Sequence, residues 1–415
     1  MMAVNHENGV SQLFSSSNDG GTYRLVLENI RYFQRKRNNL SLDTIYSADV
    51  HDVKGLSGCF LANQHSLQTS EQVETNKTLI TWDSGKTWQY LAMPDVEKKS
   101  TSGETLNLHL EKTLTDIGFF APSTLTKDSS PGYIIAHGAV AKTIQERPEQ
   151  LNLYISTDGG KNWRETKPSG LQGRFVTTFL DSGAITIVIQ MNPYTPRKTL
   201  HFSTTEGRDW KPIQFSHELI SVDAILTEPG ELTKIVTIFG HVTWTKPWQI
   251  YTVNLTTLAQ ACTQTDYQNW TYADCSDNSE TTIGMEMKFM RRKVDASCYN
   301  GADFKRSIFN HSCEQCSIKD YFCQSGSVVT EDKRCKNVDR SSSASSPYMI
   351  KKSNLRPIKA PGNQCVKEYN WARPKKSFPG RNHNGTASQL NLKIVGTTSS
   401  IFAMWVFCLF FYYIN

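Results

Sequence analysis

Cysteine is nearly absent from the first 261 residues of this 415-residue chain, where only Cys59 occurs. Sustained helical periodicity is also hard to find before residue 390. The first absence excludes a disulfide scaffold for this region, and the second argues against a helical fold. What remains are short apolar runs typical of strands, such as AITIVIQM (184–191), GYIIAHGAV (132–140) and KIVTIFGHV (234–242). We therefore predict a mainly β chain.

One short pattern, S/T-x-D-x-G-x-x-W, recurs four times, each time after a strand-like run. Asn and Tyr replace Asp and Trp in the first copy, and Thr replaces Asp in the last. The four copies are Ser16, Asn18, Gly20 and Tyr23; Thr81, Asp83, Gly85 and Trp88; Ser156, Asp158, Gly160 and Trp163; and Ser203, Thr205, Gly207 and Trp210. A repeat in register with strands indicates one supersecondary unit used several times.

The chemistry of this pattern is that of a tight turn. The aspartate can accept backbone N–H bonds, the glycine allows a positive φ, and the aromatic ring covers the turn. This is the Asp-box of β-propeller proteins, and we interpret its residues as structural. We expect Trp88, Trp163 and Trp210 to be buried at the corners of the turns. An incomplete ring of blades would also leave open sheet edges, which invite aggregation.

Eight of the ten cysteines are clustered between residues 262 and 365. They are Cys262, Cys275, Cys298, Cys313, Cys316, Cys323, Cys335 and Cys365. So dense a cluster predicts a small module held by disulfides, because a short segment buries little core. Zinc is the alternative, since the CEQC sequence at 313–316 has the spacing of a ligand pair.

Six N-glycosylation sequons support a lumenal or extracellular location when they are read together with the cysteine cluster. Their asparagines are Asn39, Asn76, Asn254, Asn269, Asn310 and Asn384. The start of the chain, MMAVNHENGVSQLF, does not resemble a secretory signal. A lumenal chain needs a signal for translocation, so we expect this sequence to begin inside a longer protein.

Residues 394–414 form an uncharged run that is just long enough to span a bilayer as a helix. The preceding residues 374–393 read as a basic, polar stalk, and we predict no nucleic-acid partner for the basic residues around it. A lipid-anchor signal is the alternative, because small residues at 384–386 precede a short spacer and an apolar tail.

The order of these features resembles the sortilin-type vacuolar protein sorting receptors. The likeness covers roughly residues 1–370, and the segments that carry it include YRLVLENIRYF, ITWDSGKTW, LYISTDGGKNW, FLDSGAITIVI and CEQCSIKDYFCQSG. It implies that residues 1–255 form about the last four blades of a ten-bladed propeller. It also implies a cysteine-rich module at 256–373, the stalk at 374–393 and a transmembrane helix at 394–414.

The resemblance further implies a disulfide pairing that spacing alone leaves open. The family module has ten cysteines, and two that pair with each other have no counterpart here. Matching the rest in order implies Cys262–Cys298, Cys275–Cys313, Cys316–Cys365 and Cys323–Cys335, with Cys59 as a free, buried thiol. We expect residues 338–362, which the missing bridge would have held, to be loosely attached.

The function implied by the resemblance is that of a type I single-pass sorting receptor of the Golgi, endosomes or cell surface. Its lumenal propeller would bind protein or peptide cargo. No catalytic residue, cofactor or metal is implied. Ligand-binding residues stay unknown, because those of the family belong to blades upstream of this chain. Cytosolic adaptors are not expected as partners, since only Asn415 follows the apolar run.

Two other functions stay open. Asp-boxes also occur in sialidases and other glycosidases, but no arginine triad, acid or nucleophile can be assigned in this sequence. A fragment with a purely structural role would show the same motifs. Coding sequence upstream of Met1 and in frame with it would favour the receptor.

Overall fold

The computed structural model describes residues 2–7, 10–16, 23–36, 44–67, 74–94, 106–111, 123–145, 147–191, 196–228, 231–242, 248–276, 283–306, 308–323, 327–337, 356–360 and 362–371. The chain divides into two compact units, Met1–Ala372 and Arg373–Asn415, and the second lies wholly outside the described residues. Also outside them are Asn18 and Gly20 of the first Asp-box, the sequons at Asn39 and Asn384, most of residues 338–362 and the predicted stalk and membrane span.

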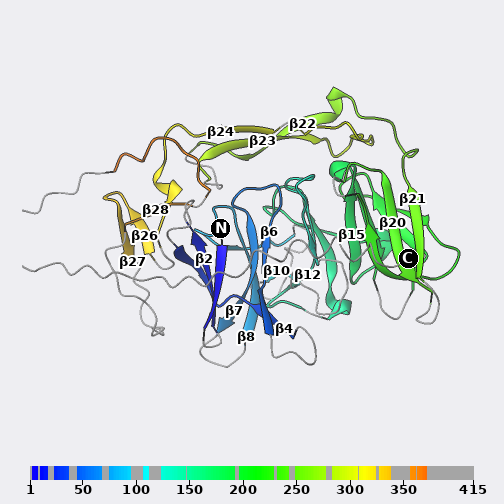
Figure 1. The fold of residues 1–415 in the computed structure, drawn as a ribbon, viewed down its shortest axis with the longest axis horizontal. Helices are drawn as coiled ribbons and strands as arrows, with labels where there is room; N and C mark the ends of the chain where they lie inside the picture. The colour runs from blue at the N-terminus through cyan, green and yellow to red at the C-terminus, as the bar shows by residue number, and fades with distance from the viewer. Residues whose placement is uncertain are drawn as a thin grey trace, which may run out of the picture. The chain divides into compact units, whose positions relative to one another are not determined.

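Five antiparallel sheets of three or more strands occupy the described part of residues 1–255 (Figure 1). The first is β1-β2-β3 (Met2–Glu7, Val10–Ser16, Tyr23–Glu28), and the second is β6-β7-β8-β9 (Val50–Asp52, Phe60–Leu67, Glu74–Thr81, Gln89–Tyr90). The third is β10-β12-β13-β14 (Asn107–Leu110, Ile134–Ala141, Asn152–Ser156, Arg164–Thr166), with β11 (Thr124–Leu125) also paired to β12. The fourth is β15-β16-β17-β18 (Phe175–Leu180, Ile185–Gln190, Thr199–Ser203, Lys211–Gln214), and the fifth is β19-β20-β21 (Ser221–Leu226, Ile235–His241, Trp248–Asn254).

Each sheet packs face to face against the next through a core cluster. Leu13 and Val26 join the first sheet to Leu79 of the second. Three further clusters join the second sheet to the third, the third to the fourth, and the fourth to the fifth. Strands such as β12 and β16 are therefore buried on both faces, which explains why their sequences are continuous apolar runs rather than alternating ones.

The count of about four blades was too low, because the described residues contain five such sheets. Each of the first four carries one Asp-box between its last two strands, whereas the fifth ends at β21 and has none. Counting boxes therefore misses the sheet that lacks one. This repeated, face-packed arrangement makes the first part of the chain mainly β and propeller-like.

The remaining described strands form one further three-stranded sheet and three two-stranded sheets. The sheet β22-β23-β24 (Tyr267–Ala273, Met285–Arg292, Ile308–Ser312) packs through Tyr272 and Phe289 onto the core shared by the second and third sheets (Figure 1). The two-stranded sheets are β4-β5 (Tyr32–Lys36, Thr44–Ala48), β25-β28 (Tyr321–Phe322, Ile358–Lys359) and β26-β27 (Ser327–Thr330, Arg334–Asn337).

Helical structure in the described residues is limited to short 3-10 turns. These are η2 (Pro148–Gln150), η3 (Pro168–Gly170), η4 (Asp181–Gly183), η5 (Gln264–Asp266) and η6 (Ile318–Asp320). In the part of the chain that is described, none of the helices has the length and apolar character needed to cross a membrane.

Candidate functional site

The third Asp-box shows how the repeated turn is built. Two consecutive residues, Gly159 and Gly160, have φ values of 76° and 88°. The Ser156 hydroxyl donates to Asp158 Oδ1 at 2.9 Å and accepts the N–H of Gly160 at 2.8 Å. Asp158 Oδ1 in turn accepts the N–H of Asn162 at 2.9 Å. The hydroxyl and the carboxylate thus satisfy the backbone groups that a left-handed turn leaves unpaired.

The second box has the same network, with Thr81 and Asp83 in the equivalent roles. In the fourth box, Thr205 Oγ1 accepts the N–H of Asp209 at 2.9 Å, which is the bond that the aspartate accepts in the other two. The turn therefore needs an acceptor at this position rather than a charge. The first box is described only at Ser16, which is buried, and at Tyr23, which is 44% exposed.

Burial of the box tryptophans is only partly as expected. Trp163 is buried, but Trp88 and Trp210 are half-buried. Trp163 lies in the cluster that β22 and β23 help to close, whereas the other two pack only against the margins of their clusters. The prediction that all three would be buried was therefore wrong for two of them.

The box turns also connect neighbouring sheets. A Cβ on Gly160 would lie 2.3 Å from Cδ1 of Ile80 in β8, and one on Gly207 would lie 2.3 Å from Cδ1 of Ile155 in β13. The indole N–H of Trp82 donates to the carbonyl of Gly159 at 2.7 Å. Each glycine therefore allows a turn to pack against the third strand of the preceding sheet. These contacts make the boxes structural links.

Three arginines fasten the β22–β24 segment to turns of the third and fourth sheets. Arg292 is the most buried, at 8% exposure, and its guanidinium donates to the carbonyls of Ala296, Cys298, Ala184 and Thr204. The last two belong to turns of the fourth sheet. Among the described residues, no carboxylate hydrogen-bonds to Arg292, so backbone carbonyls accept its hydrogen bonds. Desolvation lowers its pKa, and the nearby charges of Glu206 and Asp181 oppose that shift.

The other two arginines of the β22–β24 segment also contact turns of the third and fourth sheets. Arg306 donates to the carbonyls of Ser129 and Ser182, both at 3.0 Å, and its burial lowers its pKa to about 10. Arg291 donates to the carbonyl of Thr157 and contacts Glu206 at 3.2 Å. Glu206 lies in the turn of the fourth Asp-box. We call Arg291, Arg292 and Arg306 the arginine clasp.

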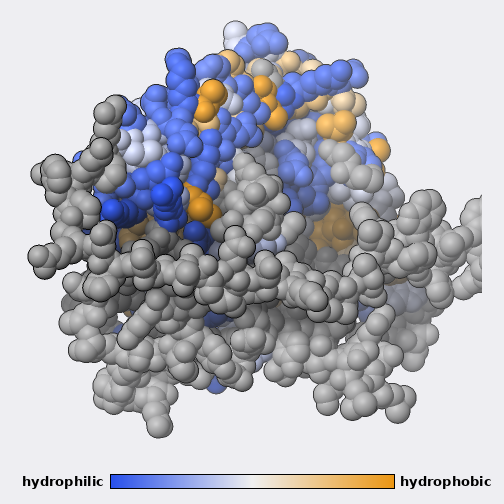
Figure 2. Space-filling view, turned by 60° about the vertical axis from the view of Figure 1, so that its left-hand side comes forward, coloured by the Kyte–Doolittle hydropathy of each residue, from blue (hydrophilic) through white to orange (hydrophobic). Residues whose placement is uncertain are grey.

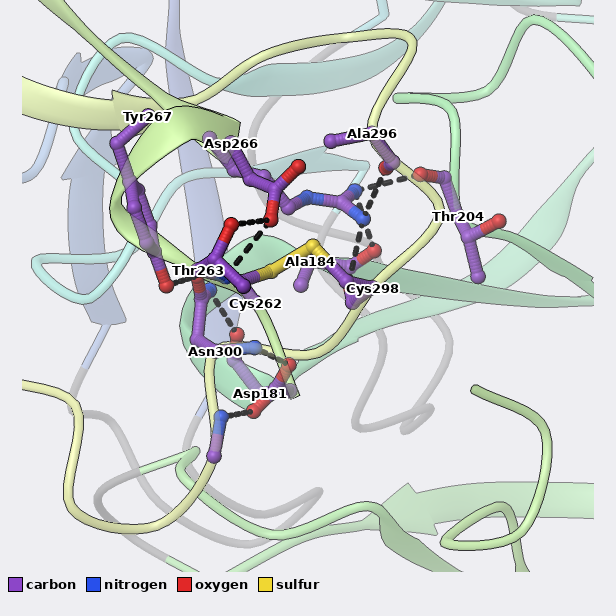
Figure 3. Close-up of a disulfide and its surroundings, with 12 residues drawn as sticks. Asp181, Ala184, Thr204, Cys262, Thr263, Asp266, Tyr267, Ala296, Cys298 and Asn300 are labelled. Carbon is purple, nitrogen blue, oxygen red and sulfur yellow. Dashed lines mark hydrogen bonds between the residues drawn. A yellow bond between two sulfur atoms is a disulfide. The ribbon is translucent and has the colours of Figure 1, made fainter. Parts of the chain in front are cut away.

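The Cys262–Cys298 disulfide lies beside this clasp, in the environment drawn in Figure 3. On one side, Thr263 caps η5 by exchanging hydrogen bonds with Asp266. On the other, Asp181 of the fourth sheet accepts the N–H groups of Asn300 and Gly301 at 2.6 and 2.7 Å. Burial raises the pKa of Asp181, and those two hydrogen bonds oppose the rise. The junction is therefore fixed by a disulfide, a buried carboxylate and the clasp.

A cavity of about 30 Å³ lies inside this junction, lined by Tyr133, Glu206 and the clasp arginines among others. It has room for a single water molecule. A much larger cleft, of about 710 Å³, lies in the cysteine-rich segment. Asp274, Gln315, Ile318, Tyr369, the Cys275–Cys313 disulfide and Cys316 are among the residues that line it. Of the two, only the larger cleft has the volume of a ligand site.

Four disulfides join Cys262–Cys298, Cys275–Cys313, Cys316–Cys365 and Cys323–Cys335, which are the pairs that the family resemblance implies. Cys313 and Cys316 of the CEQC sequence thus belong to different bridges. The two groups in the described residues with the spacing of a metal site, Cys262–Asp266–Cys298 and Cys316–Asp320–Cys365, each contain a bridged pair. A disulfide offers no thiolate, so neither group supports zinc.

Cys59 is a free thiol and fully buried, with its Sγ 3.7 Å from the carbonyl of Gly159. Desolvation raises its pKa, so the thiolate is strongly disfavoured. Its surroundings are the apolar core between the second and third sheets. We therefore interpret it as a core residue.

The described sequon asparagines differ in exposure. Asn254, Asn269 and Asn310 are exposed. Asn76 is half-buried in β8, and its side-chain oxygen lies 2.5 Å from Nδ1 of His65. Figure 2 shows the surface at the top of the view, where Figure 1 places β22–β24, as largely hydrophilic with isolated hydrophobic residues. That sheet carries Asn269 and Asn310.

Residues 1–225 match the family model described as sortilin, neurotensin receptor 3, and residues 227–378 match the model of its C-terminal part. The chain belongs to the sortilin family. Members of this family are sorting receptors rather than enzymes. The arginine clasp that joins the two matched parts was not predicted from the sequence, and its one visible signal is the pair of adjacent arginines in MRRKVDASC.

Among curated relatives, the sortilin-related receptor of Mus musculus is 34% identical over 351 residues, which is 80% of this chain and 15% of that protein. The VPS10 domain-containing receptor SorCS2 of Homo sapiens is 29% identical over 319 residues, covering 76% and 26%. SorCS1 of Homo sapiens is 26% identical over 393 residues, covering 92% and 32%. The chain thus spans about a third or less of the length of these sortilin-family relatives.

Solved structures give weaker matches. The GH74 enzyme of Niastella koreensis has a TM-score of 0.29 at 10% identity, covering 70% of this chain and 44% of that one. The Trypanosoma rangeli sialidase in complex with the inhibitor DANA has a TM-score of 0.24 at 11% identity, covering 62% and 54%. Scores this low carry no argument about activity, so the sortilin-family assignment rests on the sequence matches.

Proposed function

We propose that this chain forms the lumenal part of a type I membrane sorting receptor that carries protein or peptide cargo between the Golgi, endosomes and the cell surface. The observation that carries the proposal is the match of both parts of the chain to the sortilin family. The propeller-like sheets would present the cargo surface, and the cysteine-rich segment would support them above the membrane. Residues 394–414 would supply the transmembrane helix.

The arginine clasp is consistent with a cysteine-rich segment that holds the propeller-like sheets in place. Its hydrogen bonds reach the turns around Ser129, Thr157 and Ser182, which belong to two successive sheets. A segment held to one turn could swing, whereas one held to several turns keeps a fixed position. Fixed placement suits a receptor that must hold its binding surface away from the membrane.

The four disulfides and the exposed sequons support a lumenal location. Disulfides persist in the oxidising secretory compartments, and an exposed Asn-x-Ser/Thr can accept a glycan. We propose that Asn254, Asn269 and Asn310 are glycosylated. Asn76 is a poor acceptor, because its side chain is held within a strand. Asn39 and Asn384 remain predicted sites outside the described residues.

The test is to express the full chain in cultured cells, behind a secretory signal peptide fused to Met1, and to measure glycosylation, membrane attachment and cargo binding. We expect PNGase F to increase its gel mobility, carbonate extraction to leave it in the membrane, and a displayed peptide library to yield ligands that bind saturably. A matched control with Asn254, Asn269 and Asn310 each changed to Gln should lose most of the mobility shift. An unglycosylated, carbonate-extractable protein would contradict the proposal.

A further inference from the structure

The turn that follows the Cys262–Cys298 disulfide contains the pair Asn300-Gly301 (Figure 3). Gly301 has a φ of 88°, a conformation that favours glycine at this position. Asn-Gly is also the dipeptide in which an asparagine loses its side-chain amide most readily, because glycine has no Cβ to hinder ring closure. The chain has three such pairs, and Asn300-Gly301 is the one that lies within the described residues.

Loss of this amide needs only water as a co-reactant. The backbone nitrogen of Gly301 gives up its proton and attacks Cγ of Asn300, and the new C–N bond closes a succinimide ring. The bond from Cγ to Nδ2 breaks, and the side-chain nitrogen takes up a proton and leaves as ammonia. Water then opens the ring at either carbonyl, which leaves aspartate or isoaspartate at position 300. Asn300 and Gly301 are both partly exposed, so water reaches them.

In the folded chain, hydrogen bonds fix all the atoms that would react. Oδ1 of Asp181 accepts the N–H of Gly301 at 2.7 Å, so the nitrogen that would attack keeps its proton beside a negative charge. The backbone carbonyl of Asp181 accepts from Nδ2 of Asn300 at 2.8 Å, which holds the leaving nitrogen. The Tyr267 hydroxyl donates to Oδ1 of Asn300 at 3.0 Å and so holds the other end of the amide.

We propose that Asn300 is a latent deamidation site, which Asp181 and Tyr267 protect while the junction is closed and which reacts when the junction opens. Aspartate at position 300 would place a carboxylate oxygen against the Asp181 carbonyl that now accepts from Nδ2. Isoaspartate would add a methylene to the main chain and move the N–H of Gly301 away from the Asp181 carboxylate. Both products hinder reclosure, so the modification leaves the cysteine-rich segment permanently less firmly held.

The experiment follows the tryptic peptide 294–305 by mass spectrometry while the full chain is incubated in detergent at neutral pH. Its one asparagine is Asn300, so conversion of an amide to a carboxyl is assigned directly. We expect the folded chain to keep the amide, and the same chain in guanidinium with reduced disulfides to lose it. Asp181→Asn should react about tenfold faster than the folded wild type, because it loses the charge beside the attacking nitrogen. The matched control is Asp266→Asn, on the other side of the same disulfide, where the carboxylate bonds to Thr263 instead; it should react as slowly as the wild type.

Tyr267→Phe is a second variant, because it removes the bond to the Asn300 side chain and keeps the ring that stacks on Phe304. It should accelerate the reaction less than Asp181→Asn, and it decides the question if that variant does not fold. Asn300→Asp reproduces one product and should exchange the amide hydrogens of β22 faster than the wild type. The proposal is overturned if the folded wild type loses the amide as fast as the denatured chain, if no folded variant reacts faster than the Asp266 control, or if Asn300→Asp leaves hydrogen exchange unchanged.

Discussion

Residues before 255 and residues after 262 are both built from antiparallel strands, but they are stabilised by different means. In the earlier region, whole strands such as β15 are buried on both faces, and no disulfide is present in the described residues. In the later region, strands such as β24 are mostly exposed, and four disulfides hold the segment together. Cross-links are concentrated where little apolar surface is buried, as expected for a small module.

Removal of a disulfide from the later region should therefore lower the stability of that region and leave the earlier region unchanged. The Cys316–Cys365 bridge spans 49 residues, and its replacement by two alanines should cost about 4 kcal/mol in the chain-entropy model. The 12-residue Cys323–Cys335 bridge should cost about 3 kcal/mol. Chemical denaturation with hydrogen exchange as the readout would measure both. Equal loss of protection in β12 and β16 would contradict the comparison.

Acid should affect the earlier region instead. His137 is buried, donates from Nδ1 to the Ser123 carbonyl and accepts the N–H of Phe175 at Nε2, and burial lowers its pKa to about 4. Folding favours the neutral form of His137. The contribution of His137 to the free energy of unfolding is therefore complete above pH 6.5 and is lost as the pH falls from 6.5 to 4. The loss should reach about 3 kcal/mol.

Unfolding measured at several pH values between 7 and 4 would test this contribution. His137→Gln should be less stable at pH 7 and should flatten the pH dependence. His217→Gln, which changes an exposed histidine, should leave the profile as it is. A profile unchanged by the His137 substitution would show that another group is responsible.

The junction between the two regions should break when the clasp is shortened. In Arg292→Lys, a single ammonium cannot reach the four carbonyls that the guanidinium contacts, so buried acceptors lose their partners. We expect a cost of about 2 kcal/mol and faster proteolysis between the fifth sheet and β22. Arg208→Lys in an exposed position is the control. Equal proteolysis of both variants would argue against the clasp.

The smallest effect is expected at a box turn. In Gly160→Ala, the added Cβ is placed on a residue with positive φ and lies close to the Ile80 side chain. The substitution should lower the free energy of unfolding by about 1–2 kcal/mol. Gly170→Ala is a matched control, because its φ is also positive, at 77°, but nothing lies within 4 Å of the added Cβ. The difference between their melting temperatures isolates the packing contribution. No difference would mean that Ile80 simply moves aside.

The sequence was sufficient for features whose cause is local. The Asp-box turns are fixed by residues within eight positions, so Ser156, Asp158 and Gly160 could be assigned from the residue pattern alone. The burial of Trp88 and Trp210 could not be predicted in this way, because it depends on which sheet covers each turn. The clasp was missed for the same reason, since Arg292 finds its partners about a hundred residues away.

The partners of Arg292 have a consequence for how this junction can evolve. They are all main-chain carbonyls, at Ala184, Thr204, Ala296 and Cys298. Every residue type has such a carbonyl, so the contact does not itself select the side chain at either turn: the partly exposed Thr204 can change while the contact persists, and Ala184 is restricted only by its own burial. In an alignment of related sequences, the residue at position 292 would then not covary with the residues whose carbonyls it contacts. The arginine alone would be conserved at this junction.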